Sequence, residues 1–262
     1  MTGIAGLGSV WFESGKSFSV FVRKHGNHMD PRHLFVDQRF IGMCVYCGGT
    51  PNTRDHVPSR VFLDEPLPPD VPVVDACEDC NNSFSIHEQY VACLLECVIN
   101  GSAEPDEVER YKVKKILTEN PSLGVRIAEG CTKDDNGKLV WKVEEDRVKT
   151  VIMKLARGHA AFQLGLPQLG EPEEISFVPF VVMSDEQRTT FELGSTSSAP
   201  LWPEIGSRAF ISAVKSCTIA YEKDWLTVQA SRYRYFVDHT GVGLVIKMVL
   251  SEYLACRVVW LA

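Results

Sequence analysis

The spacing of hydrophobic and polar residues predicts three helices between residues 86 and 164. Over residues 86–99 the apolar positions recur every three or four residues, as they do on the buried face of a helix. A second helix is expected over residues 105–117, because Pro105 suits a first helical position and the acidic residues after it suit the helix dipole. The third is expected over residues 147–164.

Beyond Gly170 the apolar runs become short and are typical of strands. Asp134 to Gly137 has the composition of a tight hairpin turn, with residues 139–143 as the returning strand. The prolines of residues 62–73 predict a loop. Strands are expected over residues 17–22, 175–182, 225–230, 233–237, 243–250 and 255–261, and residues 207–216 suit either a strand or a short helix. The chain is therefore expected to be α+β with a mostly antiparallel sheet.

Composition narrows the class of protein without identifying it. The chain has 262 residues, of which 45% are hydrophobic and 23% charged, as in an ordinary globular protein. No apolar run approaches the eighteen or so residues of a membrane span. The net charge of -7 argues against uniform attraction to nucleic acid, but residues 1–60 and 111–170 are each net positive. Local patches could therefore hold phosphates, although ordinary solvated faces explain the charges equally well.

Two C-x-x-C pairs carry the strongest chemical signal. Cys44 and Cys47 precede Gly48-Gly49, which suits a tight turn, and Cys77 and Cys80 follow thirty residues later. The N-terminal residues lack the basic and apolar regions of a secretory signal, so a reducing cytoplasmic location is expected. Four thiolates in this spacing predict a closed structural zinc site. The other cysteines, Cys93, Cys97, Cys131, Cys217 and Cys256, are expected to be buried core residues.

Between the pairs lies an acid-histidine dipeptide, Asp55-His56, and Asn81 directly follows the second pair. A second such dipeptide, Asp238-His239, has no neighbouring cysteines and is expected to lie in a hairpin turn. His159 follows the apolar face of the third helix and is expected to be a packing residue. Three further histidines, His25, His28 and His33, suit a polar loop better than a metal cluster.

The order C-x-x-C, Asp-His-Val-x-Pro, C-x-x-C-Asn resembles the HNH endonucleases, in the subclass with a four-cysteine zinc site. The resemblance covers about residues 40–100. It implies a treble-clef ββα-metal core, in which a β-hairpin presents the acid-histidine pair to a helix that presents the final asparagine. Asp55 and Asn81 would then coordinate a catalytic Mg²⁺ or Mn²⁺, and His56 would be the general base.

The resemblance leaves some positions open. The middle asparagine of the family has no clear counterpart before Cys77, where the candidates are Asp70 and Asp75. His87 could supply a further metal ligand, although a solvated helix-surface histidine is the simpler interpretation. Arg54 and Arg60 flank the dipeptide and could clamp the scissile phosphate, or could form surface salt bridges.

The expected organisation is an N-terminal extension (residues 1–39), an HNH-like core (40–100) and a C-terminal region of unknown role (101–262). The expected function is metal-dependent hydrolysis of phosphodiester bonds, with DNA as the partner and restriction or phage defence as the setting that the resemblance implies. Two alternatives remain. One is a zinc-stabilised nucleic-acid-binding module without catalysis, and the other is a protein-interaction module with a purely structural zinc.

Overall fold

The computed structural model describes residues 42–193, 225–238 and 243–261, and the backbone of the strand residues 9–10, 18–19, 220–222 and 239–240. The chain divides into two compact units, Met1–Leu34 and Phe35–Ala262, so residues 40–100 and 101–262 belong to one unit. In the first unit β1 (Ser9–Val10) pairs antiparallel with β2 (Phe18–Ser19). The expected strand over residues 17–22 is described only at β2. Residues 207–216, Cys217 and the loop histidines His25, His28 and His33 lie outside the described residues.

The cysteine-rich region forms a hairpin followed by a long helix. β3 (Thr53–His56) pairs antiparallel with β4 (Val73–Ala76), and the loop between them contains the 3-10 helix η3 (Arg60–Phe62). α1 (Glu78–Asn100) starts at Cys77, which caps it by accepting a hydrogen bond from the Cys80 N–H. The expected helix over residues 86–99 is thus confirmed but begins earlier, because the cysteine pair itself forms its first turn.

The middle of the chain differs from the prediction at residues 105–117. A 3-10 turn, η4 (Pro105–Glu107), is followed by α2 (Tyr111–Glu119) and then by α3 (Pro121–Glu129). The single helix is wrong because residues Val108 and Arg110 have extended backbone angles between the two elements. The expected hairpin is confirmed as β5 (Cys131–Lys133) and β6 (Leu139–Trp141), and the third helix as α4 (Glu145–Leu164).

The C-terminal part forms one antiparallel sheet. Its strands run in the order β7 (Glu174–Pro179), β12 (Leu254–Leu261), β11 (Gly243–Leu250), β10 (Tyr233–Thr240), β9 (Trp225–Gln229) and β8 (Ala220–Glu222). The 3-10 helix η5 (Phe180–Val182) and α5 (Asp185–Glu192) follow β7. Asp238 and His239 pair with β11 as part of β10, so their placement in a turn was wrong. The α+β class is confirmed.

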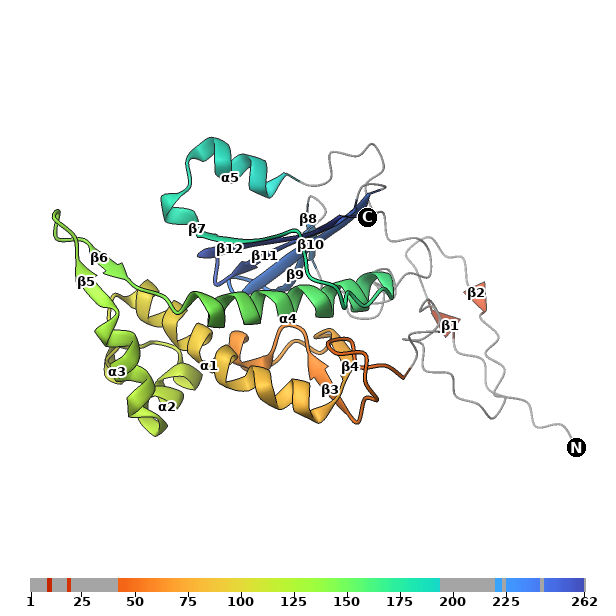
Figure 1. The fold of residues 1–262 in the computed structure, drawn as a ribbon, viewed down its shortest axis with the longest axis horizontal. Helices are drawn as coiled ribbons and strands as arrows, with labels where there is room; N and C mark the ends of the chain where they lie inside the picture. The colour runs from red at the N-terminus through yellow and green to blue at the C-terminus, as the bar shows by residue number, and fades with distance from the viewer. Residues whose placement is uncertain are drawn as a thin grey trace, which may run out of the picture. The chain divides into compact units, whose positions relative to one another are not determined.

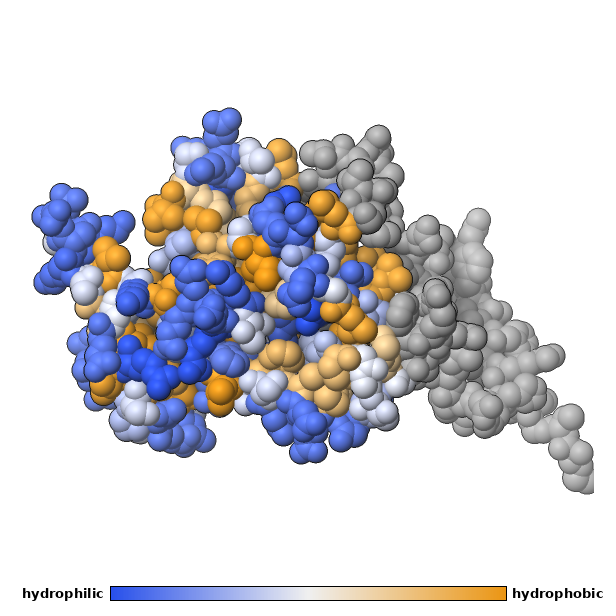
Figure 2. Space-filling view, in the orientation of Figure 1, coloured by the Kyte–Doolittle hydropathy of each residue, from blue (hydrophilic) through white to orange (hydrophobic). Residues whose placement is uncertain are grey.

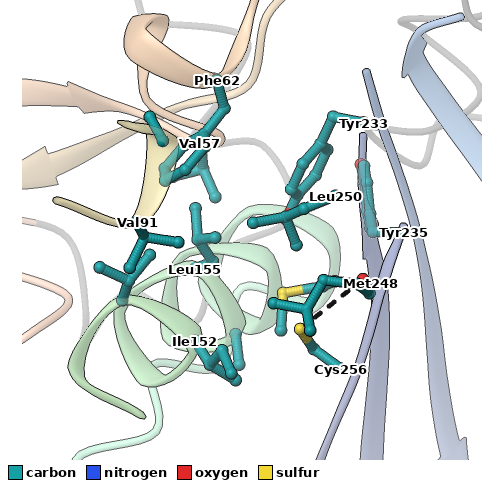
Figure 3. Packing of buried hydrophobic residues seen from close by; sticks show 14 of the residues in the cluster. Val57, Phe62, Val91, Ile152, Leu155, Tyr233, Tyr235, Met248, Leu250 and Cys256 are labelled. Atoms are coloured by element: carbon teal, nitrogen blue, oxygen red, sulfur yellow. Dashed lines mark hydrogen bonds between the residues drawn. The ribbon is translucent and has the colours of Figure 1, made fainter. Parts of the chain in front are cut away.

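Within the second unit, α4 lies between the sheet on one side and α1 with the β3–β4 hairpin on the other (Figure 1). Figure 3 shows Ile152 and Leu155 of α4 between Val57 and Val91 on one side and Met248 and Cys256 of the sheet on the other. One continuous hydrophobic core therefore joins the cysteine-rich region to the sheet. This burial, the dominant stabilising term in folding, holds α4 against the hairpin.

The surface is mixed in character. On the face seen in Figure 2, hydrophilic residues dominate over the region of α1 to α3, and hydrophobic ones form smaller groups, one of them beside β7 and η5. Within the described part of the chain, no helix is long and apolar enough to cross a bilayer.

Candidate metal centre and hairpin–helix site

The two cysteine pairs converge on one point. The Sγ atoms of Cys44, Cys47, Cys77 and Cys80 all lie within 4.8 Å of one another. The Sγ atoms of Cys47 and Cys77 are 3.7 Å apart. Tetrahedral zinc with bonds of about 2.3 Å to four thiolates needs sulfurs about 3.8 Å apart. The donor set and its spacing therefore fit a structural zinc ion, and the four cysteines are a candidate zinc site.

Local backbone geometry explains why the first pair can form this site. The Cys44 N–H donates to the Gly49 carbonyl at 2.7 Å, and the Gly48 N–H donates to the Cys44 carbonyl at 2.9 Å, which closes the turn. Gly48 has φ of 78°, a conformation that disfavours a side chain. The Val45 N–H donates to the Asp75 carbonyl at 3.1 Å and joins the turn to β4. The sulfurs are thus presented by a rigid turn attached to the hairpin.

Backbone hydrogen bonds favour the thiolate form of Cys44. Burial would raise the pKa of Cys44, but hydrogen bonds from the backbone N–H groups of Cys77, Tyr46 and Cys47 outweigh it and lower the pKa. Backbone N–H groups directed at sulfur favour the thiolate, which is the form that binds metal. In the second pair the Cys80 N–H donates to the Cys77 sulfur at 3.4 Å.

Asp55 points from β3 into the protein. Successive side chains of a strand point to opposite faces, so Arg54 is exposed and Asp55 is buried, with only 5% of its surface exposed. Its Oδ2 atom accepts a hydrogen bond from the Tyr46 hydroxyl at 2.7 Å and lies 2.8 Å from the Lys154 ammonium. Tyr46 lies between the two cysteines of the first pair, so the turn that carries them is linked to Asp55 through the Tyr46 side chain.

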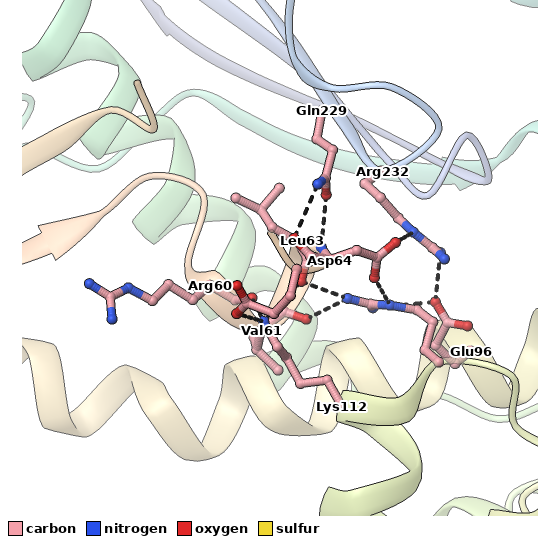
Figure 4. Close-up of polar contacts among 10 residues, drawn as sticks. Arg60, Val61, Leu63, Asp64, Glu96, Lys112, Gln229 and Arg232 are labelled. Carbon is pink, nitrogen blue, oxygen red and sulfur yellow. Dashed lines mark hydrogen bonds and ion pairs between the residues drawn. The ribbon is translucent and has the colours of Figure 1, made fainter. Parts of the chain in front are cut away.

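His56 lies at the end of β3, and its Nε2 atom is 3.2 Å from Nη2 of Arg60. A guanidinium can only donate, so Nε2 is the acceptor and the imidazole is neutral in this arrangement. Burial lowers the pKa of His56 and the charge of Arg60 lowers it further, while Asp55 opposes them. Figure 4 shows the Arg60 side chain pointing away from the neighbouring cluster of polar contacts.

Asn81 comes to the hairpin from the first turn of α1. Its Nδ2 atom lies 3.5 Å from the Arg54 carbonyl of β3, which is a long hydrogen bond. The Asn52 side chain caps the same helix by accepting from the Glu78 N–H at 2.7 Å. The structure therefore brings Asn81 beside the strand that carries Asp55 and His56.

The remaining predicted positions are placed differently. His87 lies on α1 near Arg147 and Glu144, where burial and the charge of Arg147 lower its pKa. Its Nδ1 atom is buried without a hydrogen-bond partner among the described residues. Asp75 lies opposite Arg54 in the hairpin register, and Val73 lies opposite His56. In the part of the chain that the structure describes, only the four cysteines bring three or more Cys, His, Asp or Glu side chains within metal-binding distance.

Two buried charged residues at this site were missed by sequence reasoning. Lys154 of α4 contacts both Asp55 and Glu88 of α1, at 2.8 and 2.7 Å. The signal was present in the pattern, since each interrupts the apolar face of its helix: Lys154 lies next to Leu155, and Glu88 lies three residues before Val91. A buried charge needs a partner, but the pattern does not say which partner.

Searches among protein-family models, curated proteins and solved structures found no match for this chain. The functional interpretation therefore rests on the residues and their geometry.

Proposed function

We propose that this chain is a metal-dependent endonuclease of the HNH type, with a treble-clef core that holds structural zinc through Cys44, Cys47, Cys77 and Cys80. The observation that carries the proposal is that Asn81, in the first turn of α1, lies against β3, the strand that carries Asp55 and His56, in the same region as four clustered sulfurs. Zinc ligation alone would account for the cysteines, but not for an acid-histidine pair and an asparagine at the same hairpin–helix junction.

In the proposed reaction the neutral imidazole of His56 takes a proton from water as the water attacks phosphorus. The bond from phosphorus to the leaving ester oxygen breaks, that oxygen takes a proton from solvent, and the His56 imidazolium returns its proton to solvent. The support is that His56 has a lowered pKa and that the contact with Arg60 leaves Nε2 as the unprotonated nitrogen of a neutral ring. In the proposed reaction Arg60 turns to the phosphate and Nε2 takes the proton of the water. Nucleic acid, most simply DNA, is the proposed partner.

A divalent cation, Mg²⁺ or Mn²⁺, would be bound by hard oxygen ligands from Asp55 and Asn81 and would stabilise negative charge on the phosphate and the leaving oxygen. The contacts of Asp55 with Tyr46 and Lys154 both fall on Oδ2, so Oδ1 is the proposed ligand atom. Arg54 and Arg60 would bind the phosphate, since both are exposed beside His56.

The test is nicking of supercoiled plasmid with Mg²⁺ or Mn²⁺ by zinc-loaded wild-type protein, His56→Ala and Asn81→Ala, all purified identically. Loss of a general base is expected to lower the rate by about 100-fold or more. His87→Ala is expected to cleave normally, because His87 lies beside Arg147 rather than at the junction. Cleavage that persists unchanged in His56→Ala would contradict the proposal.

A second candidate function is a zinc-stabilised nucleic-acid-binding module without catalysis. The observation that favours it is that the Asp55 carboxylate already has an ammonium partner in Lys154. If wild-type protein binds DNA but does not nick it, or cleave single-stranded DNA or RNA, with either metal, this second function replaces the first. If it binds no nucleic acid, a protein-interaction role is the remaining alternative.

A further inference from the structure

The Asp55–His56 segment is held from outside the cysteine-rich region, by a helix that begins 89 residues after His56. We propose that Lys154 of α4 is a positioning residue for this segment, so that the site is incomplete without the C-terminal part of the chain. The inference rests on the proposed function, because the role of His56 comes from there.

The Lys154 ammonium group contacts the segment at several points. It lies 2.8 Å from Oδ2 of Asp55 and donates to the backbone carbonyl of His56 at 3.3 Å. It also donates to the Ser59 hydroxyl at 2.6 Å, three residues further along. One cation therefore holds the side chain before His56, the peptide of His56 itself and the chain after it. A group that only attached α4 to the core would not need all three contacts.

The opposite side of the ammonium group is held by α1. Lys154 lies 2.7 Å from Oε1 of Glu88, and the Ser59 hydroxyl donates to the same carboxylate oxygen. Because α1 also carries Asn81, Lys154 connects the two elements that form the junction. The cluster contains two carboxylates and one ammonium, all buried, so Lys154 is their only charged partner among the described residues. Without it, the two acids would repel each other and Asp55 would keep only Tyr46 as a hydrogen-bond donor.

A second, uncharged contact from α4 acts on the same segment. Gly158 lies one turn beyond Lys154 and faces Val57, the residue after His56. A Cβ atom at position 158 would lie 2.6 Å from a methyl carbon of Val57, which is too close for any real contact. The helix therefore fits against the hairpin on both sides of His56, through Lys154 before it and Gly158 after it.

The proposal can be tested with four variants of the full chain. Lys154→Met removes the ammonium and keeps most of the side-chain volume, and Lys154→Arg keeps the charge. Gly158→Ala displaces Val57 without changing any charge. Lys149→Met is the matched control, because Lys149 is an exposed lysine on the same helix whose partner is Glu145. Zinc content and cooperative thermal unfolding identify the variants that remain folded.

Two readouts are compared in each folded variant. The first is the NMR resonance of the His56 ring in histidine-labelled protein at one fixed pH, assigned with His56→Ala. The second is the plasmid-nicking rate, separated into kcat and KM. Lys154→Met and Gly158→Ala are expected to shift the His56 resonance and to lower kcat by about 100-fold with little change in KM, because small misplacements of a catalytic group cost that much. Lys154→Arg is expected to recover part of the loss, and Lys149→Met is expected to match wild type.

The outcomes separate this inference from the proposed function. If wild-type protein does not nick DNA, the proposed function fails, and the His56 resonance still reports whether Lys154 positions the segment. An unchanged His56 resonance in folded Lys154→Met would overturn the inference. If Lys154→Met does not fold, Gly158→Ala decides: an unchanged resonance and kcat in that variant overturn it. Equal losses in Lys149→Met would also overturn it, because they would reflect a general property of α4.

Discussion

Two clusters of charged side chains join the cysteine-rich region to the rest of the chain, and they are built differently. The first, the Lys154 cluster, consists of Lys154, Asp55 and Glu88 with Ser59 and Tyr46. The second, the Asp64 cluster, consists of Asp64, Glu96, Arg110 and Arg232 (Figure 4). One has a single cation for two carboxylates, and the other has two cations for two carboxylates.

The Asp64 cluster is redundant. Arg110 and Arg232 each contact both Asp64 and Glu96, at distances from 2.5 to 3.3 Å. Arg110 also donates to the carbonyls of Val61 and Leu63, and the Gln229 side chain exchanges two hydrogen bonds with the Asp64 backbone. Removal of either arginine therefore leaves both acids with a partner. The Asp64 side chain is 40% exposed, so water screens part of the interaction.

The Lys154 cluster has neither redundant partners nor an exposed carboxylate. The side chains of Lys154, Asp55 and Glu88 are at most 9% exposed, and no second cation among the described residues contacts either carboxylate. The difference indicates different roles. The Asp64 cluster fixes the position of the sheet and tolerates change, whereas the Lys154 cluster sets the geometry of the Asp55–His56 segment and depends on one residue.

The largest expected effect is that of removing the proposed zinc, which should affect the Lys154 cluster but not the Asp64 cluster. Tyr46 lies within the cysteine turn and donates to Asp55, so chelation should loosen the Lys154 cluster and leave the Asp64 cluster in place. Structural zinc contributes on the order of 10 kcal/mol in small zinc domains. Hydrogen exchange with and without chelator is expected to show lost protection in β3, β4 and the first turns of α1, and retained protection in β10 to β12. Equal loss throughout the chain would contradict this.

Substitution of Lys154 should have the next largest effect. Lys154→Met leaves Asp55 and Glu88 buried without a cation, which typically costs about 3–5 kcal/mol of unfolding free energy. Denaturant unfolding, with Lys149→Met as the control, measures the loss. The control is expected to change stability by about 0.5 kcal/mol or less, because both members of its ion pair are more than 40% exposed. A loss of unfolding free energy below 1 kcal/mol in Lys154→Met would show that the Lys154 cluster does not depend on its single cation.

Substitution of Arg110 should cost less. Arg110→Met leaves Arg232 to pair with Asp64 and Glu96, but it also leaves the carbonyls of Val61 and Leu63 without this donor. The expected loss is about 1.5–3 kcal/mol, in the range of hydrogen bonds to charged groups. The double variant with Arg232→Met should lose more than the two single variants summed, because only then are both carboxylates unpaired. Additive losses would show that the arginines do not replace one another.

The same contrast explains what sequence could and could not predict. The cysteine spacing, the Asp55-His56 pair and the position of α4 depend on local patterns, and the structure agrees with the four-cysteine cluster and with that helix. The expected helix over residues 105–117 failed at Arg110, whose side chain is drawn into the Asp64 cluster by its carboxylate partners, 46 residues away in Asp64 and 14 away in Glu96. Tertiary contacts overrode the local signal there.

Lys154 illustrates the same limit at the site. A lysine on an apolar helix face shows that a buried partner exists, but its partner Asp55 lies 99 residues earlier in the chain. The spacing of apolar residues along the sequence does not report contacts between residues so far apart, so the Lys154 cluster could be found only in the three-dimensional structure. The role of Asp55 and Asn81 as metal ligands stays a prediction.

The smallest expected effect concerns the side of α4 that faces the sheet. There His159, predicted as a packing residue, is fully buried, stacks on Tyr235 at 3.7 Å and shares a 2.7 Å hydrogen bond with the Tyr233 hydroxyl. Burial, and then the charge of Lys154, lowers its pKa well below 6.5. The folded protein therefore resists a proton that the unfolded chain accepts, so the stability from neutral His159 is complete above pH 6.5 and declines as the pH falls below it.

This decline is at most about 1.4 kcal/mol per pH unit for one group. Unfolding free energies measured between pH 7.5 and 5.5 should fall less steeply in His159→Gln than in wild type, because glutamine can keep a hydrogen bond to Tyr233 and does not titrate. An identical slope would show that His159 takes up a proton in the fold.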